Sequence, residues 1–283
     1  MFRSVKQVKA AFSLVNPESV RSLANQPVTF GLVAASSSGY AEMEDYLIPA
    51  DVPHHRRVQL MENLHRAGDA ATPDQVDIVL YEQGLPLPHG AFQFERGNPS
   101  STINEILHVK DDLALPLARQ YPAFRTPVID KFIHTIAAEN ALFSVTTALP
   151  NVVPNLFELP WAVSEFASDT AFLTINQIRM AFLIAAASDK EIGFTHQKVE
   201  ILSIGAGAFG WRALARELAG KIPLGGGLIP KGAIAYAGTF VAGKGLQHYH
   251  AGRPRLSQHQ HRELYQEAYE RGRLVAGTLS KDS

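Results

Sequence analysis

The sequence predicts a mostly helical α+β protein in which a small α/β module is followed by an apolar multi-helix domain. Two β-prone apolar runs, 28–35 and 76–82, occur early in the chain, and helical patterns lie between and after them. From Phe124 onward, long apolar stretches follow helical spacing and no strand pattern competes with them. We therefore expect two domains, the N-terminal helices with the α/β module over 1–123 and the helical domain over 124–283.

Composition limits the class of protein before any motif is considered. The chain has 283 residues, of which 46% are apolar, as is typical of a globular protein with a sizeable core. Its net charge of −1 gives no overall field that attracts nucleic acid, so we expect no nucleic-acid partner. The absence of cysteine excludes disulfides, thiolate metal sites and a cysteine nucleophile. The N-terminal segment does not read as a secretory signal, so the expected location is the cytoplasm.

The α/β module has a clear order of expected elements. Apolar spacing from Val5 to Val15 predicts a short amphipathic helix, and Asn16-Pro17 predicts the N-cap and first position of a second one. The next expected elements are a strand at 28–35, a loop at 36–39, a helix at 40–47 and a helix at about 54–67. The last are a strand at 76–82, a short strand at 91–94 and a helix from Pro99 to about His108.

The helical domain is predicted from four apolar helical patterns and a final amphipathic helix. The patterns cover about 125–149, 160–188, 197–221 and 230–250. Ser257 and Gln260 form a capping-box pair that marks the start of the last helix. Apolar residues from Leu264 to Leu279 follow one face of that helix, which indicates that it packs against another part of the protein.

The residues after the first strand resemble a phosphate-binding loop without its chemical groups. In a working P-loop, backbone N–H groups cradle phosphate, a lysine neutralises it and a Ser or Thr hydroxyl holds magnesium. When Gly39 is aligned to the second glycine, the lysine position holds Tyr40 and the hydroxyl position holds Ala41. Because neither residue supplies the cation or the metal ligand, the module reads as a degenerate P-loop-like remnant, and hydrolysis is not expected.

The same loop supplies the candidate anion- or nucleotide-binding residues. They are Ser36, Ser37, Ser38 and Gly39, whose N–H groups and hydroxyls lie at a helix start. The alternative is a simple βα turn in which the serines cap the helix. We assign no catalytic residue, no metal site and no cofactor.

Four polar residues in the apolar helices raise a further possibility. Glu165 and Asp169 share a helix face, as do His196 and Glu200, and such groups hold metal ions in some helical bundles. The doubled Glu-x-x-His motif of those bundles is absent here. The alternative is therefore that these residues are helix caps and paired polar groups of the core.

The helical half resembles a known bacterial family. Its three segments, in order, are "LPWAVSEFASDTAFLTINQIRMAFLIAAASDKEIG" with a D-x-x-x-L-T-x-x-Q-x-x-M-like helix, "AFGWRALARELAGKIP" ending in Ile-Pro, and "AIAYAGTFVAGKGLQHYHAGR" with an A-x-x-G-T-x-x-x-G tail. Within residues 125–253 they resemble the domain of unknown function found C-terminal to Era-like GTPases and in YcjF-type inner-membrane proteins. The resemblance implies a membrane-associated helical domain and a GTPase-like start near 20–47. It carries over no catalytic residue.

Two apolar segments, 170–188 and 222–243, are long enough to cross a membrane. Each carries a cation at its centre, Arg179 in the first and Lys231 in the second. A central Arg or Lys costs roughly 2.5–3.5 kcal/mol on insertion. We therefore expect a soluble or peripheral protein rather than a spanning one.

Together these observations predict a non-catalytic protein that binds a protein partner or a membrane surface. The protein partner would be another protein or a second copy of the chain, bound through the apolar helices. The membrane surface would be the inner face of the cell membrane. The alternative is a weak nucleotide- or anion-responsive switch that acts through the Ser36–Gly39 loop and biases the helical part. An open pocket above this loop favours the switch, and a loop filled by side chains favours the non-catalytic protein. An enzyme built on the four polar residues is the third hypothesis.

Overall fold

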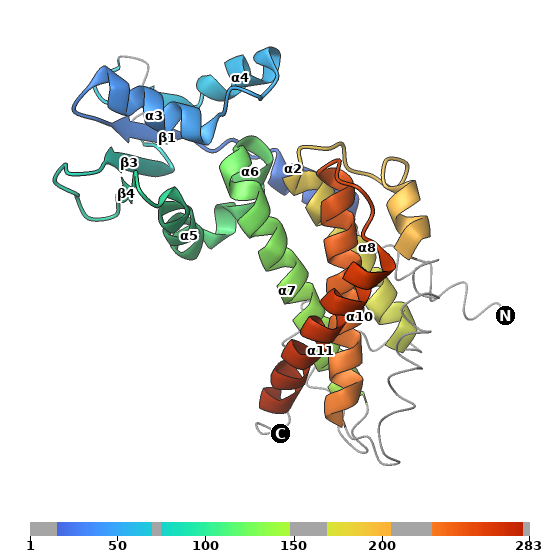
Figure 1. Cartoon of the computed structure of the whole chain (residues 1–283). Coiled ribbons are helices and arrows are strands. Elements are labelled where there is room, and N and C mark those ends of the chain that lie inside the picture. Colours follow the sequence, from blue (N-terminus) through green and yellow to red (C-terminus); the bar gives the residue numbers. More distant parts are fainter. Residues whose placement is uncertain (1–15, 70–74, 148–168, 205–227, 280–283) are drawn as a thin grey trace. The chain divides into compact units, whose positions relative to one another are not determined.

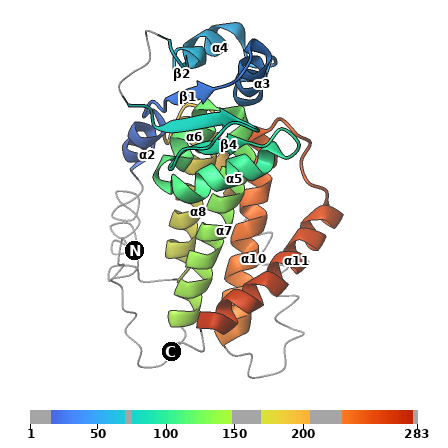
Figure 2. The same ribbon diagram turned by 90° about the vertical axis from the view of Figure 1, so that its left-hand side faces the viewer.

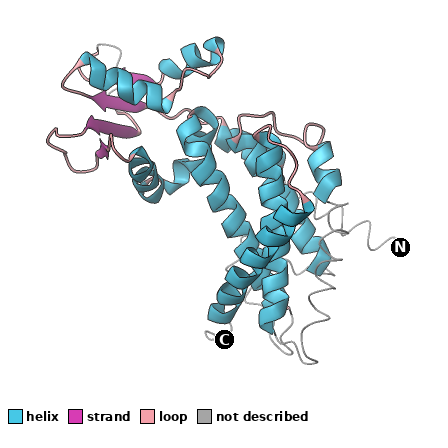
Figure 3. Ribbon diagram, in the orientation of Figure 1, coloured by secondary structure: helices cyan, strands magenta, loops and turns pink. Residues whose placement is uncertain are grey.

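The computed structural model is mostly helical and contains one small parallel sheet (Figures 1 and 3). It describes residues 16–69, 75–147, 169–204 and 228–279. The chain divides into two compact units, which we call the sheet unit (Arg21–Ile129 with Ala186–Lys190) and the helical unit (Met1–Val20, Asp130–Ala185 and Glu191–Ser283). The division falls after Ile129, whereas the sequence placed it after residue 123.

The sheet has four strands, one more than the sequence predicted. The strands are β1 (Phe30–Val33), β2 (Leu64–Arg66), β3 (Ile78–Glu82) and β4 (Phe92–Phe94). All neighbours are parallel, in the order β2-β1-β3-β4, and Phe30 is paired with both Leu64 and Ile78. The central strands are almost entirely apolar because a parallel sheet is covered on both faces. The predicted helix at 54–67 is wrong in its second half, because the helix ends at Met61 and β2 follows.

Helices and turns of the sheet unit start at the signals that the sequence carries. They are the second half of α2 (Pro17–Ala24), α3 (Ser37–Leu47), α4 (His54–Met61), α5 (Pro99–Val109), the 3-10 turn η1 (Asp111–Leu113), α6 (Ala114–Gln120) and the beginning of α7 (Pro122–Thr146). The side chain of Asn16 accepts a hydrogen bond from the N–H of Glu18 at 2.9 Å, which confirms the predicted N-cap. Pro99 opens α5 as expected, since a proline at the first helical position removes no helical hydrogen bond.

Aromatic packing joins β1 to α6 and the first turn of α7. The Phe30 and Tyr121 rings meet edge to face with centroids 4.9 Å apart, and Phe124 lies beside them at 6.3 Å from Phe30. The Tyr121 hydroxyl donates to the carbonyl oxygen of Val28 at 2.7 Å. Gln120 is also buried and donates to the carbonyl oxygen of Gln26 at 2.7 Å. Each buried polar group of this region therefore has a partner, as a stable core requires.

The helical unit consists of long helices with small residues at their contacts. Beyond α7, its described helices include α8 (Asp169–Ala187), α10 (Leu228–His250) and α11 (Gln258–Leu279). Figure 2 shows α7, α8 and α10 alongside one another and α11 lying obliquely against α10. A Cβ on Gly272 of α11 would lie 2.8 Å from the Cβ of Tyr236 and 3.0 Å from the Cα of Ala233, both on α10. The glycine therefore permits the close approach of these two helices.

The capping box predicted at the start of α11 is confirmed. The Gln260 N–H donates to the Ser257 Oγ at 3.2 Å, and the Ser257 N–H donates to the Gln260 side chain at 2.9 Å. The predicted helices at 125–149, 160–188 and 230–250 correspond to α7, α8 and α10, although α8 is described only from Asp169. Of the predicted helix at 197–221, only 198–204 lies within the described residues and is helical, and the expected helix at 5–15 lies outside them. Over the part of the chain that the structure describes, no helix has both the length and the apolar character needed to cross a membrane.

Candidate functional site

The strand order places the candidate loop at a position where α/β proteins commonly bind ligands. In the order β2-β1-β3-β4, the chain leaves β1 toward β2 on one side and leaves the neighbouring β3 toward β4 on the other side. In open parallel sheets, ligands bind outside the carboxyl ends of the strands at such a switch point. The loop that contains Ser36–Gly39 follows β1 directly, and Glu82 is the last residue of β3. The predicted anion-binding residues therefore lie at the switch point.

The serines of this loop act first as helix caps. Ser36 is the N-cap of α3, and its Oγ accepts a hydrogen bond from the Gly39 N–H at 3.2 Å. The hydroxyls of Ser36 and Ser38 are 2.9 Å apart and share a hydrogen bond. The helix consequently begins at Ser37, three residues before the predicted start at residue 40. The Ser36 cap is the alternative that the sequence left open for this loop, although the helix was expected to begin only at residue 40.

A carboxylate from the neighbouring strand occupies the space beside the loop. The Ala35 N–H donates to Glu82 Oε2 at 2.8 Å. A Cβ built on Gly39 would lie 2.5 Å from the same oxygen and 2.7 Å from Oε1, so only glycine allows this approach. Arg96 donates to Glu82 Oε1 at 2.9 Å and pairs through its Nε with Glu42 at 2.6 Å. The Glu82 side chain is 13% exposed, so a half-enclosed internal anion lies where a phosphate would approach the backbone.

The neighbouring positions have partners of their own. The guanidinium of Arg66 lies over the Tyr40 ring, 5.2 Å from its centroid. The same guanidinium makes two hydrogen bonds to the Glu44 carboxylate, at 2.7 and 2.8 Å. That hydrogen-bonded pair raises the pKa of Arg66 above its ordinary value. Position 40 thus contributes a cation–π contact to the sheet unit, while the Ala41 side chain has no oxygen that can hold a metal ion.

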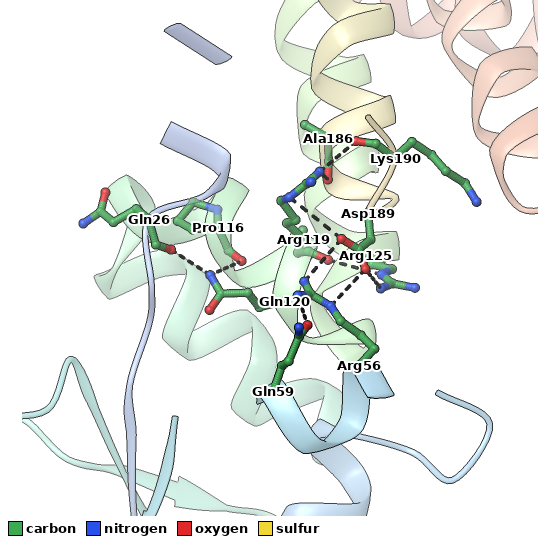
Figure 4. A network of polar contacts seen from close by, with 11 residues as sticks. Gln26, Arg56, Gln59, Pro116, Arg119, Gln120, Arg125, Ala186, Asp189 and Lys190 are labelled. Carbon is green, nitrogen blue, oxygen red and sulfur yellow. Dashed lines mark hydrogen bonds and ion pairs between the residues drawn. The ribbon is translucent and has the colours of Figure 1, made fainter. Parts of the chain in front are cut away.

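A second polar cluster in the sheet unit contains three arginines and one aspartate (Figure 4). The Asp189 carboxylate lies 3.2 Å from Nε and 3.3 Å from Nη2 of Arg56. The nearest guanidinium nitrogens of Arg119 and Arg125 are 3.8 and 3.9 Å from the same carboxylate. Arg119 also donates to the carbonyl oxygens of Ala186 at 3.4 Å and Lys190 at 2.8 Å. Asp189 has a positive φ of 57°, a conformation that Asp and Asn adopt more readily than most residues. No local pattern in the sequence indicates this cluster, because its members are separated by up to 133 residues.

Several polar residues of the helical unit form a buried network. Asn140 donates to Thr239 Oγ1 at 2.8 Å and accepts from Asn176 at 2.9 Å, and all three side chains are at most 2% exposed. Arg179, predicted at the centre of an apolar segment, forms an ion pair with Glu139 at 3.1 Å. Burial lowers the pKa of Arg179, and Glu139 opposes that effect. These groups satisfy one another between α7, α8 and α10, which fits a structural role.

The four residues of the enzyme hypothesis are only partly described. Glu165 lies outside the described residues, and nothing is described of the side chain of Asp169. His196 is exposed and Glu200 is buried, with the Glu200 carboxylate 3.6 Å from the Nε2 of His250. Within the described part of the chain, no three His, Asp or Glu side chains are close enough to hold a metal ion.

One histidine of the helical unit is held between two other polar residues. His134 Nδ1 is 2.7 Å from the Tyr236 hydroxyl, and Arg271 donates to His134 Nε2 at 3.0 Å. The same nitrogen of Arg271 lies 3.4 Å from Nδ1, and because a guanidinium only donates, the imidazole accepts from it in the neutral form. Partial burial and the nearby Arg271 both lower the pKa of His134. This histidine therefore prefers the uncharged form in the folded protein.

Sequence reasoning missed Glu82, Arg96 and the arginine cluster. Only Glu82 carried a usable signal, because an acidic residue at the end of a buried strand next to a βα loop can reach that loop. Comparison of the chain with protein-family models, curated proteins and solved structures finds no match. The function is therefore inferred from the chemistry of the chain itself.

Proposed function

We propose that the protein is a non-catalytic binding protein whose sheet unit is a P-loop-like remnant with an internal anion in place of a phosphate. The observation that carries the proposal is the Glu82 carboxylate, which accepts from the Ala35 N–H and lies against Gly39. An incoming phosphate would meet this negative charge before it reached the loop. Neither Tyr40 nor Ala41 offers the cation or hydroxyl that would compensate for the repulsion.

The binding role is proposed from the surface of the helical unit. Large apolar side chains are exposed there, with Leu202 at 71%, Tyr249 at 54% and Val199 at 49%. Exposed apolar groups favour contact with a protein partner, a second copy of the chain or a membrane surface. The resemblance to the domain found with Era-like GTPases and in YcjF-type proteins supports the same class of function, and we retain membership of that family as part of the proposal.

One observation favours the alternative, a weak anion-responsive switch. Within the described chain, the backbone N–H groups of Ser37 and Ser38 donate no hydrogen bond, and both residues are exposed at the start of α3. Such N–H groups attract anions at a helix N-terminus. The switch requires that an anion bind these groups while Glu82 stays in place, or that it displace Glu82.

Thermal unfolding with and without GTP, GDP and ATP, each with magnesium, tests the proposal. A ligand present at a hundred times its Kd stabilises the fold by about 2.7 kcal/mol, which is an easily measured shift. The non-catalytic proposal predicts no shift that arises at the loop and no phosphate release. The switch is favoured if a nucleotide raises the unfolding temperature, if substitutions in the Ser36–Gly39 loop abolish that rise, and if substitutions elsewhere leave it unchanged.

A pair of variants tests whether Glu82 holds the loop. Glu82→Ala leaves the Ala35 N–H without its acceptor and Arg96 with Glu42 as its remaining carboxylate, and we expect a loss of about 1–3 kcal/mol in stability. Glu105→Ala is the control, because Glu105 is an exposed carboxylate on α5. Equal stability of the two variants contradicts the role given to Glu82.

The binding role has its own test. Flotation with vesicles of anionic phospholipid detects membrane contact, and light scattering after gel filtration detects self-association. Recovery of all the protein as a monomer in the soluble fraction at low salt excludes the membrane surface and the second copy. A different protein is then the remaining binding partner. That partner would then be sought by replacing the exposed Leu202 with Asp and comparing the proteins captured.

A further inference from the structure

The arginine cluster of the sheet unit has more positive charge than its own carboxylates neutralise. Arg56, Arg119 and Arg125 surround Asp189, which gives three cations and one anion (Figure 4). Asp51 is a further carboxylate that influences Arg125, and it raises the pKa of that group. Three guanidinium groups against two carboxylates leave an excess of one positive charge in a partly enclosed place.

The hydrogen-bond donors of the cluster are unevenly used. Arg119 is committed to two backbone carbonyl oxygens, and Arg56 to Asp189 and Gln59. Arg125 donates through Nε to the Ala118 carbonyl oxygen at 3.3 Å. Within the described residues, its two terminal nitrogens make no hydrogen bond, and the nearer one is 3.9 Å from the Asp189 carboxylate. Arg125 therefore presents two free donors beside a carboxylate that it does not reach.

The surroundings make these donors effective without closing them off. The side chains of Arg56 and Arg125 are 27% and 33% exposed, so solvent reaches both. Burial lowers the pKa of Arg125, with Arg56 and Arg119 acting in the same direction against Asp189 and Asp51. An added anion would relieve this repulsion among like charges, and partial burial strengthens the attraction relative to an exposed surface.

We propose that the cluster of Arg56, Arg119 and Arg125 is an oxyanion site that binds a phosphate group beside Asp189. The planar guanidinium donates two parallel hydrogen bonds to phosphate or carboxylate oxygens, and this geometry favours such groups over a simple halide. Arg125 supplies the terminal donors, Arg56 faces the same space, and Arg119 holds the Ala186–Lys190 segment that carries Asp189. The site takes either free phosphate or the phosphate group of a small phosphorylated molecule, and it does not depend on the function proposed above.

Titration calorimetry with inorganic phosphate, at constant pH and ionic strength, tests the site. We expect binding by the wild-type chain and a loss of affinity of about tenfold or more in Arg125→Gln, since hydrogen bonds to charged groups are among the strongest. Arg57→Gln is the matched control, because Arg57 follows Arg56 on the same helix but forms a one-to-one pair with Asp45 at 2.7 Å. The control should bind phosphate as the wild type does.

A second variant keeps the test decisive if Arg125→Gln does not fold. Asp189→Asn removes the competing negative charge and keeps a residue that tolerates positive φ, so phosphate affinity should rise. The absence of phosphate binding overturns the proposal, as does an equal loss in Arg57→Gln or a fall in affinity in Asp189→Asn. Glycerol phosphate is the second probe, and binding of inorganic phosphate alone identifies free phosphate as the ligand.

One further experiment distinguishes a failure of the phosphate-site proposal from a failure of the proposed function. Nucleotides also carry phosphates, so the thermal unfolding with nucleotides is repeated in Arg125→Gln. A nucleotide shift that this variant abolishes belongs to the arginine cluster and leaves the non-catalytic proposal intact. A shift that persists in the variant belongs to the Ser36–Gly39 loop and favours the switch.

Discussion

The contact between α10 and α11 makes a sharp prediction about two glycines on the same helix. Gly272→Ala places a methyl group 2.8 Å from the Cβ of Tyr236 and 3.0 and 3.1 Å from the Cα and carbonyl oxygen of Ala233. Gly277→Ala, five residues further along α11, meets nothing within 4 Å. The two substitutions add the same atom to the same helix, and they differ in what that atom meets.

The magnitudes follow from these distances. Carbon atoms pack at about 3.5–4.0 Å, so the new methyl group at position 272 is at least about 0.7 Å too close. Two of its three neighbours belong to the α10 backbone, which cannot rotate away, so the helices must separate. Such overpacking costs about 1–3 kcal/mol. Replacing a helical Gly with Ala returns about 0.5–1 kcal/mol, a gain that both variants share.

The assay is urea unfolding followed by circular dichroism, with the two variants and the wild type measured together. We expect Gly272→Ala to be about 1–3 kcal/mol less stable than Gly277→Ala, because their shared helical gain cancels in the difference. Gly277→Ala should equal or exceed the wild type. If Gly272→Ala is as stable as Gly277→Ala, the close approach of α10 and α11 at Gly272 is refuted.

Three other predictions address the helical unit. Because the pKa of His134 is lowered on folding, the unfolded chain binds the extra proton first, so the stability that His134 contributes is complete above pH 6.5 and declines as the pH falls below it. His134→Gln should flatten this part of a plot of unfolding free energy against pH, and an unchanged slope would contradict the contact with Arg271. Asn140→Ala removes the nearer acceptor of the buried Asn176 and the donor to Thr239, and denaturant unfolding should show a loss of about 2–3 kcal/mol. Ser257→Ala removes the cap of α11 and should lower the unfolding free energy by about 1 kcal/mol, and no change would mean that the cap is not formed in solution.

Local signals in the sequence predicted many helix starts correctly. Asn16 and Ser257 are followed by residues whose backbone N–H groups they cap, and each cap lies within three residues of its partner. The strands β1 and β3 were predicted because each is a short run of apolar residues. β2 was missed because Leu64–Arg66 contains only one apolar residue and continues the pattern of the preceding helix. Pairing with β1, which no local pattern reveals, makes that segment a strand.

The candidate site depends on contacts between residues that are distant in sequence, and these were not predictable from local patterns. Glu82 is 47 residues from Ala35, and Asp189 is 133 residues from Arg56. The charge of such a residue predicts that it is either exposed to solvent or paired with another polar group. It does not predict which residue is the partner. The side chains of Asn176 and Gln177 bridge helices, since buried amides in apolar helices need partners. The partner itself, Asn140, became evident only from the fold.

The position of Glu82 against Gly39 also determines how this loop can change during evolution. A lysine introduced at position 40 would lose the ring that now carries Arg66 and would place a second cation beside that arginine. It would also find the Glu82 carboxylate already bound to the Ala35 N–H. Neither the lysine nor a threonine at position 41 would then be of use until Glu82 had also been replaced. If the loop is the P-loop-like remnant proposed above, nucleotide hydrolysis would require several substitutions together, and each of them alone would weaken the fold or bring no gain, so an epistatic barrier separates the present loop from a catalytic one.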